Sequence, residues 1–210
     1  FVPFISAAQH QAAEQDTIFL DSGWKVTKHR ELAKYYRQIF KGGQDTILVH
    51  DYYLSTGTIQ MVGTYYQEMK PSNQNGRFQY FYPSGSMKAV YDYKWGIIHG
   101  ELRRYYRNGQ LKSIEQFDMG TKVDTTWIYY DNGQLHKLLV ENTEFSATNP
   151  SDKFSKQLLI QSFSKEGEEQ VVNGSGVYEE YFLSGKLKSS IEFVSGLPHG
   201  KWIKYSGQKN

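Results

Sequence analysis

Histidine is the residue type in this sequence best suited to acid–base or metal chemistry, and the chain contains 6 of them. They form no His-x-His pair and no His-Glu-x-x-His motif, the spacings that place two imidazoles on one metal ion. His99 and His199 end two similar segments, 96–99 and 196–199, and a glycine follows each histidine. A side chain that recurs at the same turn position favours a structural role, in which the imidazole caps a backbone carbonyl. We therefore predict no metal site and no cofactor.

The carboxylates and hydroxyls do not form a catalytic set either. Glu168 and Glu169 are adjacent, as are Glu179 and Glu180, and adjacent residues of a strand point to opposite faces of a sheet. The segment 174–176 has a serine between two glycines but lacks the Gly-x-Ser-x-Gly spacing of a nucleophile elbow. No glycine-rich loop precedes a predicted helix, and the chain has no cysteine. The sequence predicts no catalytic residues and no enzyme.

One segment combines basic and aromatic residues, a composition typical of platforms for single-stranded nucleic acid. Its basic residues are Arg103, Arg104, Arg107 and Lys112. Glu101 and Glu115 lie among them, and the formal net charge of the whole chain is only +2, which argues against duplex nucleic acid as a partner. Contact with a membrane surface would need a basic face, and a sequence pI of about 8.5 does not establish one.

The composition indicates a folded all-β chain. Charged residues make up 22% of the sequence and hydrophobic residues 39%, the balance of a folded domain rather than a disordered one. The 17 tyrosines, 12 phenylalanines and 4 tryptophans favour strands, and the 19 glycines favour turns between them. No apolar run approaches the length of about 18 residues at which a membrane helix is suspected.

Four segments repeat an aromatic pair, two further residues and a glycine. The glycines are Gly85, Gly109, Gly133 and Gly185. The first three are 24 residues apart, and the fourth follows after 52 residues, which is two periods plus four. Asn-Gly at two of these positions and Ser-Gly at the other two indicate hairpin turns, for which we predict type I′ geometry with positive φ at both central residues. The chain is therefore expected to consist of successive antiparallel hairpins.

The aromatic pairs predict two columns of side chains on opposite faces of the sheet, because successive residues of a strand alternate in direction. One column contains Phe81, Tyr105, Tyr129, Tyr181 and Tyr205. The other contains Tyr82, Tyr106, Tyr130 and Phe182. We expect both columns to be core, with stacking that adds about 0.5–1 kcal/mol per neighbouring pair. The lysines that follow the turns, Lys88, Lys112 and Lys188, should face water.

The second turn of each unit completes a recognisable pattern. Segments 96–100 and 196–200 share Gly-x-x-His-Gly, and a degenerate copy begins at Gly120. Together with the aromatic pair and Asn-Gly-x-Leu-Lys-Ser at 108–113, this pattern resembles the bacterial variant of the MORN-like repeat, over roughly residues 51–205. The resemblance implies an extended single-sheet array of antiparallel β-hairpins. It also implies kinship with exported proteins and with proteins described as antitoxins.

We divide the chain at the limits of this array. Residues 17–56 are expected to form N-terminal capping strands and a hairpin, and residues 57–205 the repeat array. A polar insertion at 141–175 replaces a regular unit, and a strand-like run at 157–163 within it predicts a lengthened repeat rather than a linker. Residues 206–210 are expected to be a flexible tail.

The first 16 residues are expected to be the remnant of a signal peptide or a flexible N-terminus. Residues 1–8 are apolar and end in Ser6-Ala7-Ala8, the small-x-small spacing of a signal-peptidase site. This interpretation predicts an exported protein, in the periplasm, in the cell envelope or secreted. The alternative is a cytoplasmic protein with an ordinary apolar stretch at this place.

The function that these patterns predict is a non-enzymatic binding or scaffold module that presents an extended sheet face to a protein or envelope partner. The resemblance adds one alternative, an antitoxin-type protein that neutralises a toxin partner. Toxicity of a neighbouring gene product and its rescue by co-expression would identify the antitoxin, whereas association with cell-wall or outer-membrane fractions would identify an envelope protein.

Overall fold

The computed structural model describes residues 17–43, 45–145 and 153–205. The prediction of a signal-peptide remnant or flexible N-terminus at 1–16 therefore lies outside the described residues, as does the prediction of a flexible tail at 206–210.

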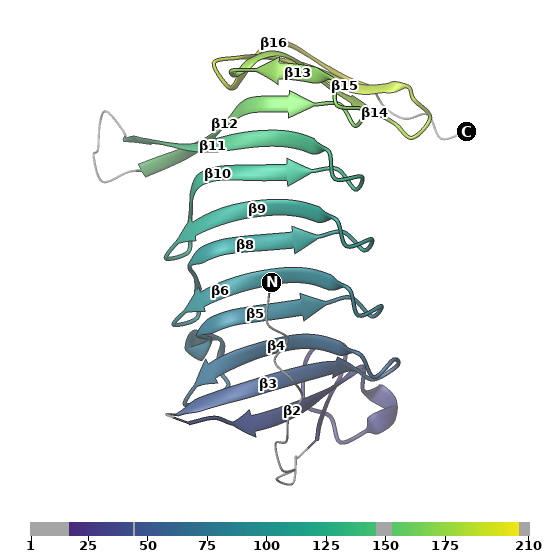
Figure 1. Cartoon of the computed structure of the whole chain (residues 1–210), viewed down its shortest axis with the longest axis vertical. Coiled ribbons are helices and arrows are strands. Elements are labelled where there is room, and N and C mark those ends of the chain that lie inside the picture. Colours follow the sequence, from purple (N-terminus) through teal and green to yellow (C-terminus); the bar gives the residue numbers. More distant parts are fainter. Residues whose placement is uncertain (1–16, 44, 146–152, 206–210) are drawn as a thin grey trace, which may run out of the picture.

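The described residues form one open antiparallel sheet, in which strands that follow one another in sequence lie side by side (Figure 1). The sheet has 16 strands in sequence order, except that β7 pairs only with β6, and the helical content is two 3-10 turns. This confirms the predicted all-β array of hairpins. The strands are β1 (Ile18–Leu20), β2 (Tyr35–Lys41), β3 (Thr46–Tyr53), β4 (Ile59–Tyr66), β5 (Gly76–Phe81), β6 (Met87–Lys94), β7 (Ile97–Ile98), β8 (Gly100–Tyr105), β9 (Leu111–Asp118), β10 (Thr121–Tyr129), β11 (Leu135–Phe145), β12 (Lys153–Phe163), β13 (Glu169–Val172), β14 (Ser175–Tyr181), β15 (Leu187–Val194) and β16 (Leu197–Lys204), and the 3-10 turns are η1 (Arg30–Leu32) and η2 (Pro71–Asn73).

The hairpin turns at the glycines 24 residues apart are present, but their predicted type I′ geometry is wrong. In the loop 106–110, the Tyr106 amide donates to the carbonyl of Gln110, and the Gly109 amide donates back to the carbonyl of Tyr106 at 3.0 Å. Gly109 has φ 86, whereas Asn108 is not among the residues with positive φ. This is a three-residue loop, a type I turn closed by a glycine in the left-handed region, and it needs one positive φ instead of two.

The type I′ turns lie at the opposite ends of the strands. Trp95 and Gly96, between β6 and β7, have φ 51 and 76, and Met119 and Gly120, between β9 and β10, have φ 42 and 82. These turns also contact one another along the array, because the Gly120 amide donates to the carbonyl of Ile98 at 2.8 Å.

A buried column runs along the array three residues before the predicted aromatic one. It consists of Phe78, Leu102, Thr126 and Tyr178, all of them 3% exposed or less. None of the aromatic pairs is fully buried, and Tyr181 is 54% exposed. The prediction that both aromatic columns form the core is therefore wrong. The first aromatic of each pair follows a buried residue by three positions, so strand alternation places it on the opposite face of the sheet, which no second sheet covers.

The second tyrosine of each pair instead joins one repeat to the next through its hydroxyl group. Tyr82 Oη donates to the carbonyl of Tyr105 at 2.9 Å, and Tyr106 Oη donates to that of Tyr129 at 2.8 Å. Tyr53 and Tyr130 make the same bond to residues 81 and 163. We call this series of hydrogen bonds the tyrosine ladder. It fixes neighbouring hairpin loops against each other at one edge of the array.

The predicted insertion at 141–175 is built of β11, β12 and β13, and the long β11–β12 hairpin projects beyond its neighbours (Figure 1). A further hairpin loop follows β12. The Ser164 amide donates to the carbonyl of Glu168, and the Gly167 amide donates to the carbonyl of Ser164, as in the other three-residue loops. The loop 164–168 thus corresponds to the loop 106–110. Beyond it, strands β13 to β16 are turned away from the plane of the preceding strands (Figure 1).

Candidate binding surface

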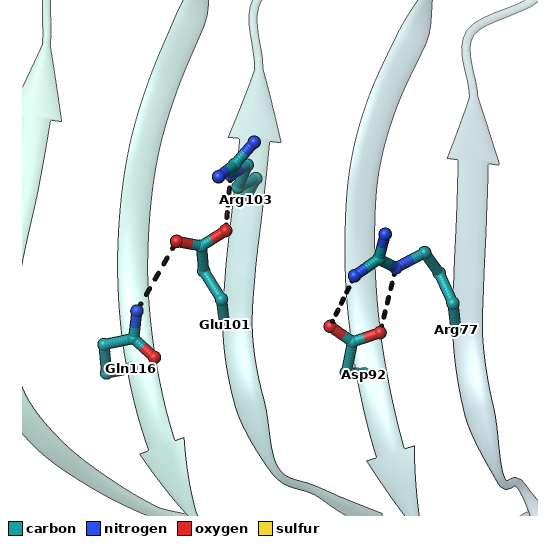
Figure 2. Close-up of polar contacts among 5 residues, drawn as sticks. All are labelled: Arg77, Asp92, Glu101, Arg103 and Gln116. Atoms are coloured by element: carbon teal, nitrogen blue, oxygen red, sulfur yellow. Dashed lines mark hydrogen bonds and ion pairs between the residues drawn. The ribbon is translucent and has the colours of Figure 1, made fainter. Parts of the chain in front are cut away.

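Alternation along the strands gives the middle of the sheet one packed face and one polar face. The packed face carries the buried column and also Ala89 and Ser113, which lie opposite Arg104 in the register and are 4% and 8% exposed. The polar face carries a strip of side chains across β5, β6, β8 and β9, which we call the polar strip (Figure 2). It consists of Arg77, Gln79, Asp92, Glu101, Arg103, Tyr105 and Gln116.

The charges of the polar strip are paired with one another. Arg77 lies opposite Asp92 in the register and binds it through two hydrogen bonds of 3.0 and 3.1 Å (Figure 2). Glu101 binds Arg103 at 2.5 Å and accepts a bond of 3.5 Å from the Gln116 amide (Figure 2). These two ion pairs, one across strands and one along β8, leave a surface that is polar and close to neutral, with a shallow hollow of about 260 Å³ between the strands.

The predicted repeat residues fall into two groups on this surface. Tyr105, which belongs to the polar strip, and Tyr129 are half-buried. Gly85, Gly109, Gly133 and Gly185 occupy equivalent loop positions at the edge of the sheet, all with positive φ. The lysines predicted to face water, Lys88, Lys112 and Lys188, are exposed.

His99 and His199 lie apart in the sheet, since β9 to β15 separate β8 from β16. His99 Nδ1 accepts a bond of 3.4 Å from the backbone amide of Met119 in the next turn, with Asp118 at the same distance from this nitrogen. The partner is therefore an amide of the neighbouring repeat and not the carbonyl that we predicted. His199 is exposed and makes no such contact within the described residues, because no further repeat follows β16 there.

Within residues 17–43, 45–145 and 153–205, no three histidine, aspartate or glutamate side chains gather in a way that could hold a metal ion. The closest approach to an acid–base network is His136, which stacks on Tyr130 with 4.1 Å between ring centroids. Tyr178 Oη donates to Glu180 at 2.8 Å, so His136 Nε2 donates to the Tyr178 oxygen, 3.0 Å away. Burial, followed by the nearby charge of Lys137, lowers the pKa of His136 to about 4. The imidazole is thus a neutral, positioned core group.

The tyrosine ladder is interrupted at one step, between the loop 164–168 and the loop 182–186. Ser164 occupies the position of Tyr106 and Tyr130, and its side chain is too short to reach the next loop. A second set of bonds is interrupted at the same step. Asn108 and Asn132 each donate from Nδ2 to a carbonyl of the following loop, at 2.6 and 3.0 Å, and Glu166 at the equivalent position has no proton to donate when ionised.

A groove of about 1080 Å³ lies at this interrupted step. Strands β13 and β14 pair only at Val171–Gly176 and Val172–Ser175, and farther along, the Gln170 side-chain amide donates to the backbone carbonyl of Glu179 at 3.3 Å. The groove is lined by Tyr130, His136, Ser164, Lys165, Glu166, Glu168, Glu169, Gln170, Val177, Tyr178, Glu179, Glu180, Tyr181, Phe182, Leu183, Gly185 and Lys188. We call it the β13–β14 groove.

The repeat matches a known family of repeats. The model described as the MORN repeat variant matches residues 74–94, 98–119 and 175–195. The chain is a MORN-like repeat protein. Each matched segment spans a strand, the three-residue loop and the strand that follows. No curated protein sequence matches the chain.

Repeats of the MORN type are in general protein-binding or membrane-binding modules and are not typically enzymatic. No helix among the described residues of this MORN-like repeat protein is both long and apolar enough to cross a membrane.

The sequence prediction included Tyr181 and Gly185 but missed the loop 164–168, and with it the β13–β14 groove that the two loops line. The signal was present, because Phe163 precedes Gly167 by four residues, the separation of Tyr129 from Gly133. This loop lacks an aromatic pair, because the second member of the pair is Ser164.

Proposed function

We propose that this chain is a non-enzymatic binding module that presents the polar face of its sheet to another protein, in an exported or envelope location. The observation that carries the proposal is the single-layer sheet. Every strand of the described residues belongs to it, so no second sheet covers the polar face. Polar strips of paired charge and half-buried tyrosine suit protein interfaces, in which aromatic and arginine side chains are enriched.

A capture experiment tests this proposal. The purified chain, immobilised and exposed to extract of its native cells, is compared with the double variant Arg77→Gln/Arg103→Gln. The matched control is Lys25→Gln/Lys28→Gln, which removes the same charge from exposed lysines before β2. We expect a partner that the wild-type chain and the control retain and that the polar-strip variant loses.

Equal retention by all three proteins would contradict the use of the polar face. If the captured partner is a toxin whose activity the chain suppresses on co-expression, the binding module serves as an antitoxin. If the captured partner is an envelope protein or cell-wall polymer, the binding module serves as a scaffold.

A further inference from the structure

We propose that the β13–β14 groove binds an extended basic segment of a partner protein, one in which lysine or arginine alternates with aliphatic residues. The inference rests on the proposed function as a binding module and adds a second site, with a stated ligand chemistry, at the interrupted step of the tyrosine ladder.

The groove exists because two donors are missing. In the loops 106–110 and 130–134 a tyrosine hydroxyl and an asparagine amide each donate to the following loop and join the two loops. At the loop 164–168 the equivalent side chains are Ser164 and Glu166, and the carbonyls of Tyr181 and Leu183 receive neither bond. The two loops are therefore not tied together, and the space between them stays open.

The walls of the groove are strongly acidic, although the whole chain is weakly basic. Five glutamates face two lysines in its lining, a local net charge of −3, whereas the chain carries +2. Lys165 binds Asp131 at 2.7 Å, and Lys188 binds Glu180 at 3.3 Å. The exposed carboxylates of Glu166, Glu168 and Glu169 have no ion-pair partner in the described part of the chain.

Apolar side chains lie beside these carboxylates. Val177 and Tyr181 are about half exposed, and Leu183 is fully exposed at the tip of its loop. Large apolar side chains that are held out of the core next to a groove indicate an interaction site. A ligand that complements this groove has aliphatic groups to pack on the apolar side chains. It also has ammonium or guanidinium groups to pair with the glutamates. An acidic occupant would be repelled by the same charges.

The groove also differs from the polar strip in the state of its charges. The strip pairs its arginines with carboxylates on the same face, so a ligand gains little from charge there. In the groove, the carboxylates of Glu166, Glu168 and Glu169 have no such partner within the described residues, so a cationic ligand can pair with them. The interruption of the tyrosine ladder and the unpaired negative charge therefore both occur at the β13–β14 groove.

Fluorescence anisotropy with a labelled lysine–leucine alternating octapeptide tests the proposal on the full chain, with a glutamate–leucine octapeptide as the probe of opposite charge. The first variant is Glu166→Gln/Glu168→Gln/Glu169→Gln. Its control is Glu31→Gln/Glu68→Gln/Glu192→Gln, which removes the same charge from exposed glutamates outside the groove.

We expect the basic peptide to bind the wild-type chain, with weaker binding at higher salt, and the acidic peptide not to bind. The groove variant should lose about tenfold or more in affinity, and the control should stay within about twofold. The proposal is overturned if the basic peptide does not bind, or if groove and control variants lose affinity equally.

A second variant tests the interrupted ladder itself. Ser164→Tyr/Glu166→Asn restores both donors, and we expect it to close the groove, to keep or raise the melting temperature and to lose basic-peptide binding. Full binding by a folded variant of this kind would contradict the groove as the site. If the basic peptide does not bind but partner capture still depends on Arg77 and Arg103, the result contradicts the groove as a binding site. It leaves the proposed function as a binding module supported.

Discussion

At the scale of single residues, the repeat is held together by hydroxyl groups and not by stacked rings. Tyr106 shows this most clearly, because its ring is half-buried while its hydroxyl donates at 2.8 Å to the Tyr129 carbonyl of the next repeat. Tyrosine at this position is therefore required for its oxygen, and the aromatic pair is a signature of contact between repeats.

Replacement of Tyr106 by phenylalanine should lower the free energy of unfolding by about 1 kcal/mol, the usual net value of one hydrogen bond. Tyr129→Phe is the matched control, since the Tyr129 hydroxyl has no partner among the described residues, and it should change stability by less than about 0.5 kcal/mol. Urea denaturation of both variants measures the difference. Equal effects would mean that the ladder does not stabilise the array.

Thr126 is the polar exception in the buried column. It is 2% exposed, and its hydroxyl has no hydrogen-bond partner, whereas Phe78 and Leu102 fill the equivalent positions with apolar side chains. Thr126→Val should raise the free energy of unfolding by about 1 kcal/mol, because it removes an unsatisfied buried hydroxyl at nearly constant volume. A thermal melt checks this, and a lower melting temperature would show that the hydroxyl is paired in solution.

His136 should make stability depend on pH. Its pKa is lowered to about 4 in the folded protein from an ordinary value of 6.5, so the unfolded chain binds the proton more readily. This contribution is fully present above pH 6.5 and is lost as the pH falls towards 4. Urea denaturation between these values, on wild type and on His136→Phe, should give a steeper loss for the wild type. Equal slopes would show that the imidazole is not held neutral by burial among Tyr130, Tyr178 and Lys137.

At the scale of elements, the strands and the positions of the turns could be predicted from the sequence, but the geometry of the hairpin turns and the core could not. Gly85 and Gly109 marked the turns because glycine adopts positive φ without the steric cost that other residues incur. The packed face was missed because aromatic residues occur on both faces of the strands, and residue type alone does not show that only the face of Phe78 and Leu102 is packed. The β13–β14 groove was missed because it arises where Ser164 and Glu166 replace the tyrosine and asparagine that donate hydrogen bonds in other loops. A missing donor forms no motif in the sequence.

Two truncations on β8 distinguish the real core from the predicted one. Leu102→Ala should cost about 3 kcal/mol, since it leaves a cavity at a position that is 1% exposed. Tyr105→Ala should cost about 1 kcal/mol, because the ring is only half-buried within the polar strip. Chemical denaturation provides both values, and a larger cost at Tyr105 would restore the aromatic column as the core.

At the scale of the whole molecule, the chain is a row of hairpins joined at both edges, by tyrosine hydroxyls at one edge and by glycine amides at the other. Each unit contacts its neighbours along the row, so the faces of the sheet stay open over the length of the array. Such an architecture supplies surface rather than an enclosed site. The polar strip and the β13–β14 groove are two places on that surface with a defined chemistry.

Hydrogen–deuterium exchange of the chain, alone and with its captured partner bound, tests most directly the claim that the open polar face is the binding surface. We predict slower amide exchange on binding in β5, β6, β8 and β9, the strands of the polar strip, with little change in β2 and β3. Protection confined to β1 to β3, with none in the four strands of the strip, would contradict the claim.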